Sequence, residues 1–138
     1  MTVLFTSTAT TQGGREGRVK SDDGIIDLNL VMPSPHNKKE GSNPEQLFAA
    51  GYSACFDGAL NLIASRHKHK IESSITASVS LLKDSSDNGF KIAVTLHAHI
   101  KGVSQEVAKK LVEDAHDFCP YSKATRGNIE VSLKTTVA

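Results

Sequence analysis

A chain of 138 residues has the length of one ordinary domain, and roughly two thirds of its unfolded surface can be buried on folding. Its 38% hydrophobic and 22% charged residues are typical of globular proteins, which excludes disordered and fibrous classes. Sixteen Lys and Arg against fifteen Asp and Glu leave a formal net charge of +1, so no overall field attracts nucleic acid or an acidic membrane. We therefore expect a single domain over residues 1–138 with no nucleic-acid partner.

The N-terminal sequence, MTVLFTSTATTQGGREG, lacks a positive leader followed by a long apolar core. No later window approaches about 18 uninterrupted apolar residues. We therefore expect a cytoplasmic protein that does not enter a membrane. Because the cytoplasm is reducing, the two cysteines of the chain are expected to be free, catalytic or transiently paired rather than permanently bridged.

Three short meandering strands are predicted in the first third of the chain. Residues 3–11 and 25–32 have the β-branched or alternating pattern of strands, with a further short run between them. Gly13 with Gly14, and then the segment 22–24 (DDG), supply the turns.

A loop and then a long helix are predicted next. Residues 33–44 contain three prolines together with polar and charged residues, which is typical of a loop with a function. Asn43 as cap, Pro44 at the first helical position and Gln46 at the third form a capping-box arrangement. Residues 47–63 are apolar nearly all round, which predicts a central helix buried against a sheet.

The second half of the chain predicts a hairpin, a helix and a last strand. Residues 74–83 and 90–100 alternate and are joined by the polar DSSDNG. Ser104 can cap a helix whose apolar positions repeat every three or four residues and which Pro120 stops. Residues 129–137 form the final strand. Because strand runs and helix runs are segregated, we predict an α+β two-layer fold rather than a doubly wound parallel sheet.

The two cysteines are the residues best suited to chemistry. Cys55 lies inside the apolar central helix, and Cys119 ends the later helix just before Pro120. Each taken alone fits a buried core residue. Together, one on each long helix, they are what an intramolecular sulfenate-to-disulfide step needs. A free cysteine is only about 3% thiolate at pH 7, so a reactive Cys55 requires a positive charge or a helix N-terminus nearby.

Arg15 is the candidate for that charge, because its guanidinium is always protonated and the two preceding glycines allow a close approach. The alternative is a solvated hairpin arginine. Glu45 could hold Arg15 through an ion pair, although it also suits the helix dipole. An unbroken helix would place Glu45 about 15 Å from Cys55 along the axis. Either the helix breaks or the site is assembled in another way, and we favour a break at Gly51, with Ser53 as a new cap that places Cys55 in a first turn.

The six histidines do not predict a metal site. His67 and His69 would diverge at a helix end, while His97 and His99 could share a strand face but lack a cysteine or a carboxylate pair to complete a zinc shell. The sequence contains no CxxC, GxSxG, GxGxxG or Walker motif. We expect neither a metal nor a cofactor.

Three sequence blocks carry a family resemblance: GGREGRVKSDDG, NPEQLFAAGYSACFDGAL and FCPYSKATRGN, in that order and with both cysteines in place. Over nearly its whole length the chain resembles the organic hydroperoxide resistance proteins, the Ohr branch of the OsmC-like superfamily. The resemblance implies an intertwined homodimer with two active sites near the subunit interface. It also implies a cofactor-free peroxidase that reduces alkyl and fatty-acid hydroperoxides to alcohols and is recycled by dihydrolipoyl groups on lipoylated proteins.

The resemblance also assigns roles to individual residues. Cys55 is the peroxidatic thiolate, Arg15 stabilises it and orients the peroxide, and Glu45 holds the arginine. Cys119 condenses with the sulfenate to form a disulfide. The expected apolar substrate pocket is lined by aromatic residues that would also suit a plain core, namely Phe48, Tyr52, Phe56 and Phe118.

Two segments are expected to move, the loop His36–Ser42 and the hairpin carrying Arg15, and we expect Arg15 to leave the site once Cys55 is oxidised. Three alternatives stay open at this point. They are an OsmC-type peroxidase with another substrate range, a redox-sensing module that switches a partner interaction, and a structural protein with two inert thiols.

Overall fold

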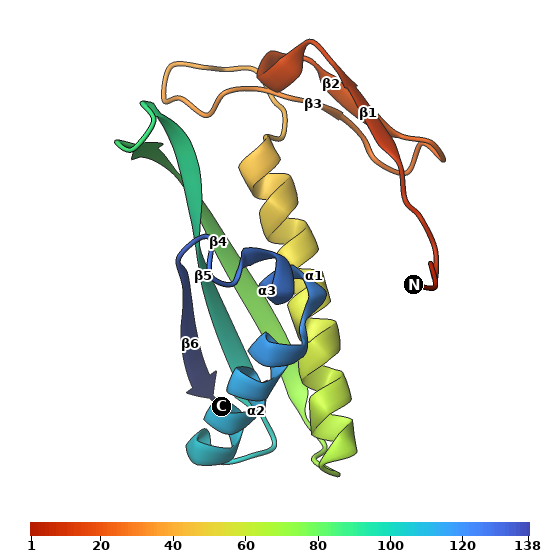
Figure 1. Ribbon diagram of the computed structural model, residues 1–138, viewed down its shortest axis with the longest axis vertical. Coiled ribbons are helices and arrows are strands. Elements are labelled where there is room, and N and C mark those ends of the chain that lie inside the picture. The colour runs from red at the N-terminus through yellow and green to blue at the C-terminus, as the bar shows by residue number, and fades with distance from the viewer. The chain divides into compact units, whose positions relative to one another are not determined.

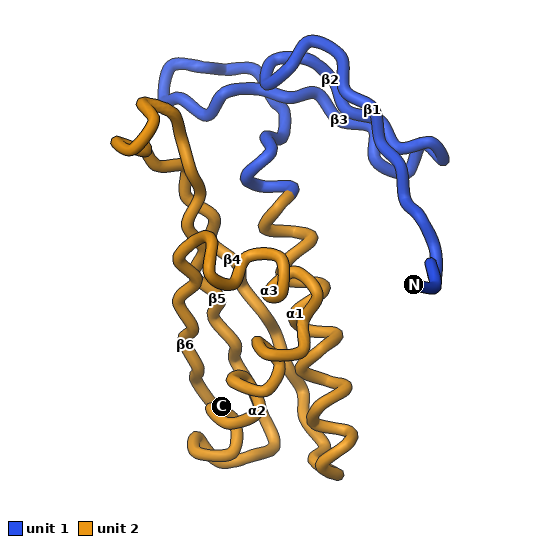
Figure 2. The backbone as a smooth tube through the Cα atoms, in the orientation of Figure 1, with its two compact units in different colours: residues 1–47 blue, residues 48–138 orange.

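The N-terminal residues form the predicted three-stranded meander. The computed structural model describes residues 1–138, and the strands pair antiparallel in the order β1-β2-β3. The elements are β1 (Ala9–Gln12), the short 3₁₀ helix η1 (Gly14–Glu16), β2 (Arg18–Ser21) and β3 (Asp27–Asn29). They belong to the first of two compact units, residues 1–47, and residues 48–138 form the second (Figure 2). The prediction of a single domain stays a prediction.

The strands of the meander are shorter than predicted. β1 begins at Ala9 rather than at residue 3, and β3 covers only residues 27–29 of the predicted 25–32. The register ends with the pair Ala9 and Ser21, and the backbone N–H of Ser21 donates to the carbonyl of Ile26 at 2.8 Å. A β-branched composition favours a strand, but a strand extends only as far as a neighbouring strand pairs with it.

Helix α1 (Pro44–Arg66) begins where the sequence predicts. Asn43 Oδ1 accepts the backbone N–H of Gln46 at 2.8 Å, as a capping residue does. The second half of the capping box differs from the prediction, because Gln46 Oε1 accepts a hydrogen bond from Ser42 Oγ at 2.7 Å. Side-chain hydrogen bonds of both Ser42 and Asn43 to Gln46 therefore fix the start of α1.

The predicted break at Gly51 is wrong, because α1 runs without interruption for 23 residues. Ser53 Oγ donates to the carbonyl of Ala50 at 3.1 Å, so it bonds back along the helix instead of capping a new one. Gly51 is needed for packing, since a Cβ there would lie 2.6 Å from Tyr121 Oη. Cys55 therefore lies near the middle of α1, where the helix dipole does not lower its pKa.

In the second unit, α1 and α2 cover one face of a three-stranded sheet in the order β4-β5-β6 (Figure 1). The predicted hairpin, β4 (Glu72–Asp84) with β5 (Gly89–Lys101), pairs antiparallel, whereas β6 (Val131–Val137) is parallel to β5. A parallel neighbour requires a crossover, which α2 (Gln105–Phe118) and α3 (Pro120–Thr125) supply. The α+β fold is confirmed, and the intertwined dimer stays a prediction.

The predicted cap of α2 is present, because Ser104 Oγ accepts the backbone N–H of Val107 at 3.2 Å. The short helix α3 is not predicted. Pro120 ends α2 as expected, but it also occupies the first turn of α3, where a missing N–H costs nothing.

Helix α1 has the length and the mean hydropathy, 1.3 over its most apolar window, of a membrane span. Its buried face nevertheless forms the core of the second unit together with β5 and α2. The largest fully buried side chains of this core are Tyr52, Phe56, Leu60, Leu96, Ile100, Val112, Cys119 and Ser122. A helix that is apolar on all sides can be either a membrane span or a buried core helix. Because α1 contributes to the core, we interpret it as a core helix.

Candidate active site

Two thiols meet where α1 faces the junction of α2 and α3. The sulfurs of Cys55 and Cys119 lie 3.5 Å apart and both residues are free cysteines. Cys119 is fully buried, and Cys55 is half-buried. A disulfide joins two sulfurs at about 2.05 Å, so these need to approach by only about 1.5 Å. The structure thus brings together two cysteines that are 64 positions apart in the sequence.

Hydrogen bonds to both flanking helices hold the backbone of Cys119. Its N–H donates to the carbonyl of Ala115 at 2.8 Å, and its carbonyl accepts the N–H of Lys123 at 3.0 Å. Cys119 itself is extended, with φ −60° and ψ 127°, and Pro120 follows it. Because Pro120 cannot continue α2, the chain turns at Cys119 and begins α3.

Burial raises the pKa of the Cys55 thiol above its ordinary value. The backbone N–H of Tyr121 acts in the opposite direction, while the neighbouring Cys119 raises the pKa further. The net effect favours the neutral thiol. A nucleophilic thiolate at neutral pH therefore needs a positive group in addition to what surrounds Cys55 in the second unit.

Within the first unit, Arg15 and Glu45 form a two-pronged ion pair. Arg15 Nη1 donates to Glu45 Oε2 at 2.9 Å, and Nη2 donates to Oε1 at 2.7 Å. The positive φ values of Gly13 and Gly14, 82° and 62°, make the turn that leads into Arg15. The side chain of Glu45 is 13% exposed and that of Arg15 is 42% exposed, so the carboxylate is the buried partner that orients the guanidinium.

The ion pair keeps both groups charged. The hydrogen bond from Arg15 holds the pKa of Glu45 below its ordinary value, and the same bond raises the pKa of Arg15. The structure thus joins the two residues that the sequence paired, and their catalytic roles remain predictions.

The four aromatic residues predicted to line a pocket have different surroundings. The rings of Phe48 and Tyr52 pack edge to face with their centroids 5.9 Å apart. Tyr52 and Phe56 have no exposed surface, so they line no open cavity of this chain as it stands. The ring of Phe118 lies 5.1 Å from the guanidinium carbon of Arg66. The substrate pocket therefore stays a prediction.

Tyr121, Ser122 and His116 lie within three positions of Cys119 along the chain, although the sequence analysis assigns them no role. The Tyr121 ring centroid lies 5.9 Å from that of Phe48 and 5.6 Å from that of Tyr52. Ser122 Oγ lies 2.8 Å from both Tyr52 Oη and His116 Nδ1. The only available signal was that Tyr121 and Ser122 follow Cys119 closely in the block FCPYSK.

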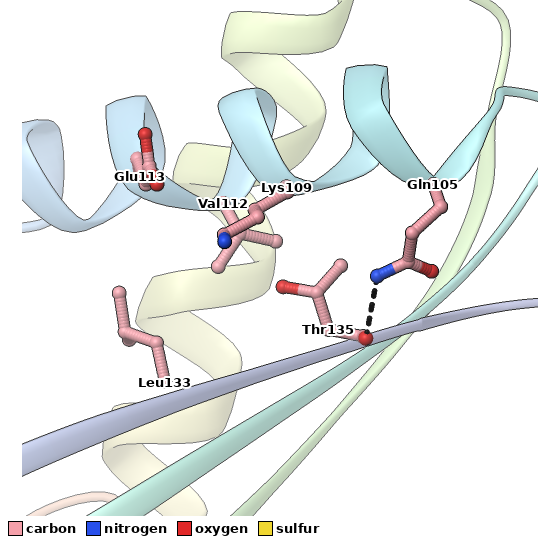
Figure 3. A pocket seen from close by; sticks show the side chains of 6 residues that line it. All are labelled: Gln105, Lys109, Val112, Glu113, Leu133 and Thr135. Atoms are coloured by element: carbon pink, nitrogen blue, oxygen red, sulfur yellow. Dashed lines mark hydrogen bonds between the residues drawn. The ribbon is translucent and has the colours of Figure 1, made fainter.

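A surface cavity of about 440 Å³ lies elsewhere in the second unit, between α2 and β6 (Figure 3). Across it, Gln105 Nε2 donates to the carbonyl of Thr135 at 3.0 Å. Its lining residues are Gln105, Lys109, Val112, Glu113, Leu133 and Thr135. Neither cysteine contributes to it, so this cavity is separate from the thiol pair.

His97 and His99 share a face of β5, as the sequence suggests. Nε2 of His97 and Nδ1 of His99 lie 2.8 Å and 2.7 Å from the hydroxyl of Thr136. The structure contains no group of three or more His, Cys, Asp or Glu side chains that could hold a metal ion.

Comparison with known proteins matches the chain to one family. The family model described as OsmC-like protein matches residues 36–134. The organic hydroperoxide resistance protein OhrB of Bacillus subtilis is 55% identical over 134 residues, which cover 95% of this chain and 97% of OhrB. OhrA of the same organism, with the same descriptive name, is 53% identical over 95% of each chain.

Solved structures agree with this match. The crystal structure of B. subtilis OhrB superposes with a TM-score of 0.94 at 52% identity, covering 97% of this chain and all of that one. An organic hydroperoxide resistance protein from Elizabethkingia anophelis gives a TM-score of 0.92 at 48% identity, covering 100% of both chains.

Proposed function

This chain belongs to the OsmC-like protein family, in its organic hydroperoxide resistance branch, and we propose that it protects the cell by reducing organic hydroperoxides at Cys55. The observation that carries the proposal is the 3.5 Å contact between the free thiols of Cys55 and Cys119. Once one of two such thiols is oxidised to a sulfenic acid, the other is close enough to condense with it to a disulfide without movement of a helix.

In the first step, the Cys55 thiolate attacks the peroxide oxygen that carries the proton. An S–O bond forms while the O–O bond breaks, and the leaving alkoxide takes up a proton to become the alcohol. Cys55 ends as the sulfenic acid. The step needs a thiolate and a donor for the alkoxide, and the raised pKa of Cys55 means that the thiolate must be stabilised from elsewhere.

Arg15 is proposed to meet both needs. A guanidinium has five N–H donors, and Glu45 accepts two of them, one from each terminal nitrogen. The three remaining donors are free to bind the thiolate and the peroxide. Because Glu45 fixes the plane of the guanidinium, little rotational freedom is lost when Arg15 binds the reacting atoms.

In the second step, Cys119 attacks the sulfur of the Cys55 sulfenic acid. A disulfide forms and water leaves, and two equivalents of thiol must then reduce the disulfide. Following the family resemblance, we propose dihydrolipoyl groups of lipoylated proteins as that reductant, a homodimer as the working form and the cytoplasm as the location. Phe48, Tyr52, Phe56 and Phe118 are proposed to favour apolar alkyl and fatty-acyl substrates.

The test is peroxide consumption by the purified protein, with tert-butyl hydroperoxide as substrate and dihydrolipoamide as reductant. We expect rapid turnover by the wild type, none by Cys55→Ser, and no intramolecular disulfide in Cys119→Ser. Ser53→Ala, which removes a hydroxyl bonded only to Ala50 on the same helix, is the matched control and should retain full activity.

Each rival function has a distinct outcome. An OsmC-type peroxidase with another substrate range would be recognised by competition between tert-butyl hydroperoxide and hydrogen peroxide. A redox sensor would consume about one peroxide per chain even with reductant present. Inert structural thiols would give no consumption and slow alkylation of both cysteines in the native state. Full activity in Cys55→Ser would overturn the proposed mechanism.

A further inference from the structure

A buried network of hydroxyl groups lies beside the two cysteines. Tyr52 Oη lies 2.8 Å from Ser122 Oγ and 3.2 Å from Thr125 Oγ1. Ser122 Oγ also lies 2.8 Å from His116 Nδ1. Because Tyr52 belongs to α1, His116 to α2 and Ser122 to α3, the single hydroxyl of Ser122 connects all three helices.

The three hydroxyl groups of this network are buried, and His116 at its edge is half-buried. Tyr52 and Ser122 have no exposed surface, and Thr125 is 4% exposed. Burial lowers the pKa of His116 and the charge of Arg126 lowers it further, against an opposing effect of Asp117, and the net shift favours the neutral imidazole. Removing the hydroxyl of Ser122 therefore takes from the buried Tyr52 hydroxyl one of its two partners, leaving Thr125 Oγ1 alone, and takes from His116 Nδ1 its hydrogen-bond partner.

The hydroxyl contact and the sulfur contact have the same spacing on both elements. Tyr52 and Cys55 are three positions apart on α1, which places them on one face of the helix. Cys119 and Ser122 are also three positions apart. The Tyr52 to Ser122 contact at 2.8 Å and the Cys55 to Cys119 contact at 3.5 Å are therefore neighbouring links between the same two segments. Fixing one link restricts the other.

Helix α3 depends on such contacts. It has only six residues, and an isolated helix of that length is unstable in water. We propose that Tyr52, Ser122 and His116 are positioning residues that hold Cys119 against Cys55 and so govern disulfide formation. This inference rests on the proposed function for its role in turnover, but the positioning itself can be measured without a peroxide.

The two chemical steps should depend differently on this network. Of the two cysteines, only Cys55 takes part in reduction of the peroxide. In the next step the Cys119 sulfur forms the S–S bond, the S–OH bond of Cys55 breaks, and the thiol proton leaves with the hydroxide as water. Cys119 is oxidised and Cys55 is reduced from the sulfenic to the disulfide level. If Cys119 is displaced, the sulfenic acid persists and a second peroxide oxidises it to the sulfinic acid.

The first measurement is the equilibrium of the cysteine pair with reduced and oxidised glutathione, which gives the effective concentration of one thiol at the other. We expect Ser122→Ala to lower this value about tenfold and the control Ser53→Ala to leave it within about twofold of the wild type. Tyr52→Phe, which keeps the ring and removes only the hydroxyl, should act in the same direction and serves if Ser122→Ala does not fold. Unchanged values in both variants would overturn the proposal.

The second measurement separates the steps after one addition of tert-butyl hydroperoxide, with the products counted by mass spectrometry. We expect Ser122→Ala to form the sulfenic acid at the wild-type rate, to form the disulfide about tenfold more slowly, and to accumulate sulfinic acid in excess peroxide. A purely structural role would slow both steps together, and that result would contradict the inference. If the wild type fails to consume peroxide, the proposed function is wrong, whereas the glutathione equilibrium still tests the positioning.

Discussion

At the scale of single residues, even a conservative substitution of Arg15 should lower activity, because the guanidinium forms two parallel hydrogen bonds with Glu45. Arg15→Lys keeps the positive charge but loses the two parallel hydrogen bonds to Glu45 and the remaining guanidinium donors that we propose bind the peroxide. We expect kcat/KM for tert-butyl hydroperoxide to fall about a hundredfold, the size of effect seen when one transition-state donor is removed. Steady-state kinetics with dihydrolipoamide measure it. Wild-type kinetics in Arg15→Lys would show that charge alone is sufficient.

Glu45 gives the same pair a pH dependence. Its pKa is lowered in the folded protein by the Arg15 hydrogen bond, from an ordinary value of 4.5. The unfolded chain therefore binds the proton more tightly, so the pair stabilises the fold above about pH 4.5 and this contribution is lost as the pH falls through the lower folded value. Since Arg15 is exposed, water screens the effect and we expect it to be small.

Urea unfolding at pH 7 and pH 3 tests this sign. The wild type should be more stable than Glu45→Gln at pH 7, and the difference should be smaller at pH 3, below the ordinary pKa of 4.5. Glu40→Gln, which removes an exposed carboxylate of the same unit that forms no ion pair, is the control. A difference as large at pH 3 as at pH 7 would mean that Glu45 acts through packing rather than through its charge.

At the scale of elements, α1 shows where pattern recognition stops. The start of the helix, its apolar character and the capping serine of α2 were all predictable, because each depends on neighbouring residues. The role of Gly51 was not, because the glycine leaves room for Tyr121, which lies 70 positions later, instead of breaking the helix. For the same reason the parallel pairing of β6 with β5 could not be read from the sequence.

The close approach of Tyr121 to Gly51 predicts that Gly→Ala substitutions at two glycines of α1 change the stability of the fold unequally. Gly→Ala within a helix ordinarily stabilises by about 1 kcal/mol. Gly58 has open space around its Cα, so Gly58→Ala should show this gain. At Gly51 the new Cβ would lie 2.6 Å from Tyr121 Oη, so Gly51→Ala should gain less or lose stability. The gain should return when Tyr121→Ala is added, as chemical unfolding of the four variants would show. Equal gains at both glycines would contradict the contact.

At the scale of the whole molecule, the site residues were predictable because the family resemblance carries them, while their surroundings were not. The sequence paired Arg15 with Glu45 and Cys55 with Cys119, and the structure places each pair in contact. The hydroxyl of Ser122 escaped notice because a serine in a short helix has no periodic signature. Its importance comes only from three helices meeting at one point.

The contact between Cys55 and Cys119 also predicts how oxidation changes the stability of the molecule. A disulfide between Cys55 and Cys119 would close a loop of 64 positions in the unfolded chain, and the chain-entropy estimate for such a loop is about 4 kcal/mol. The folded state loses little in return, since the sulfurs are already in contact and the backbone of Cys119 is bonded to both α2 and α3. We therefore expect the oxidised protein to require clearly more urea to unfold than the reduced protein. Cys119→Ser, which cannot form the bridge, should unfold at the same urea concentration under both conditions. If the oxidised wild type were no more stable than the reduced form, closing the bridge would have to distort the fold, and Cys119 would not be positioned for rapid disulfide formation.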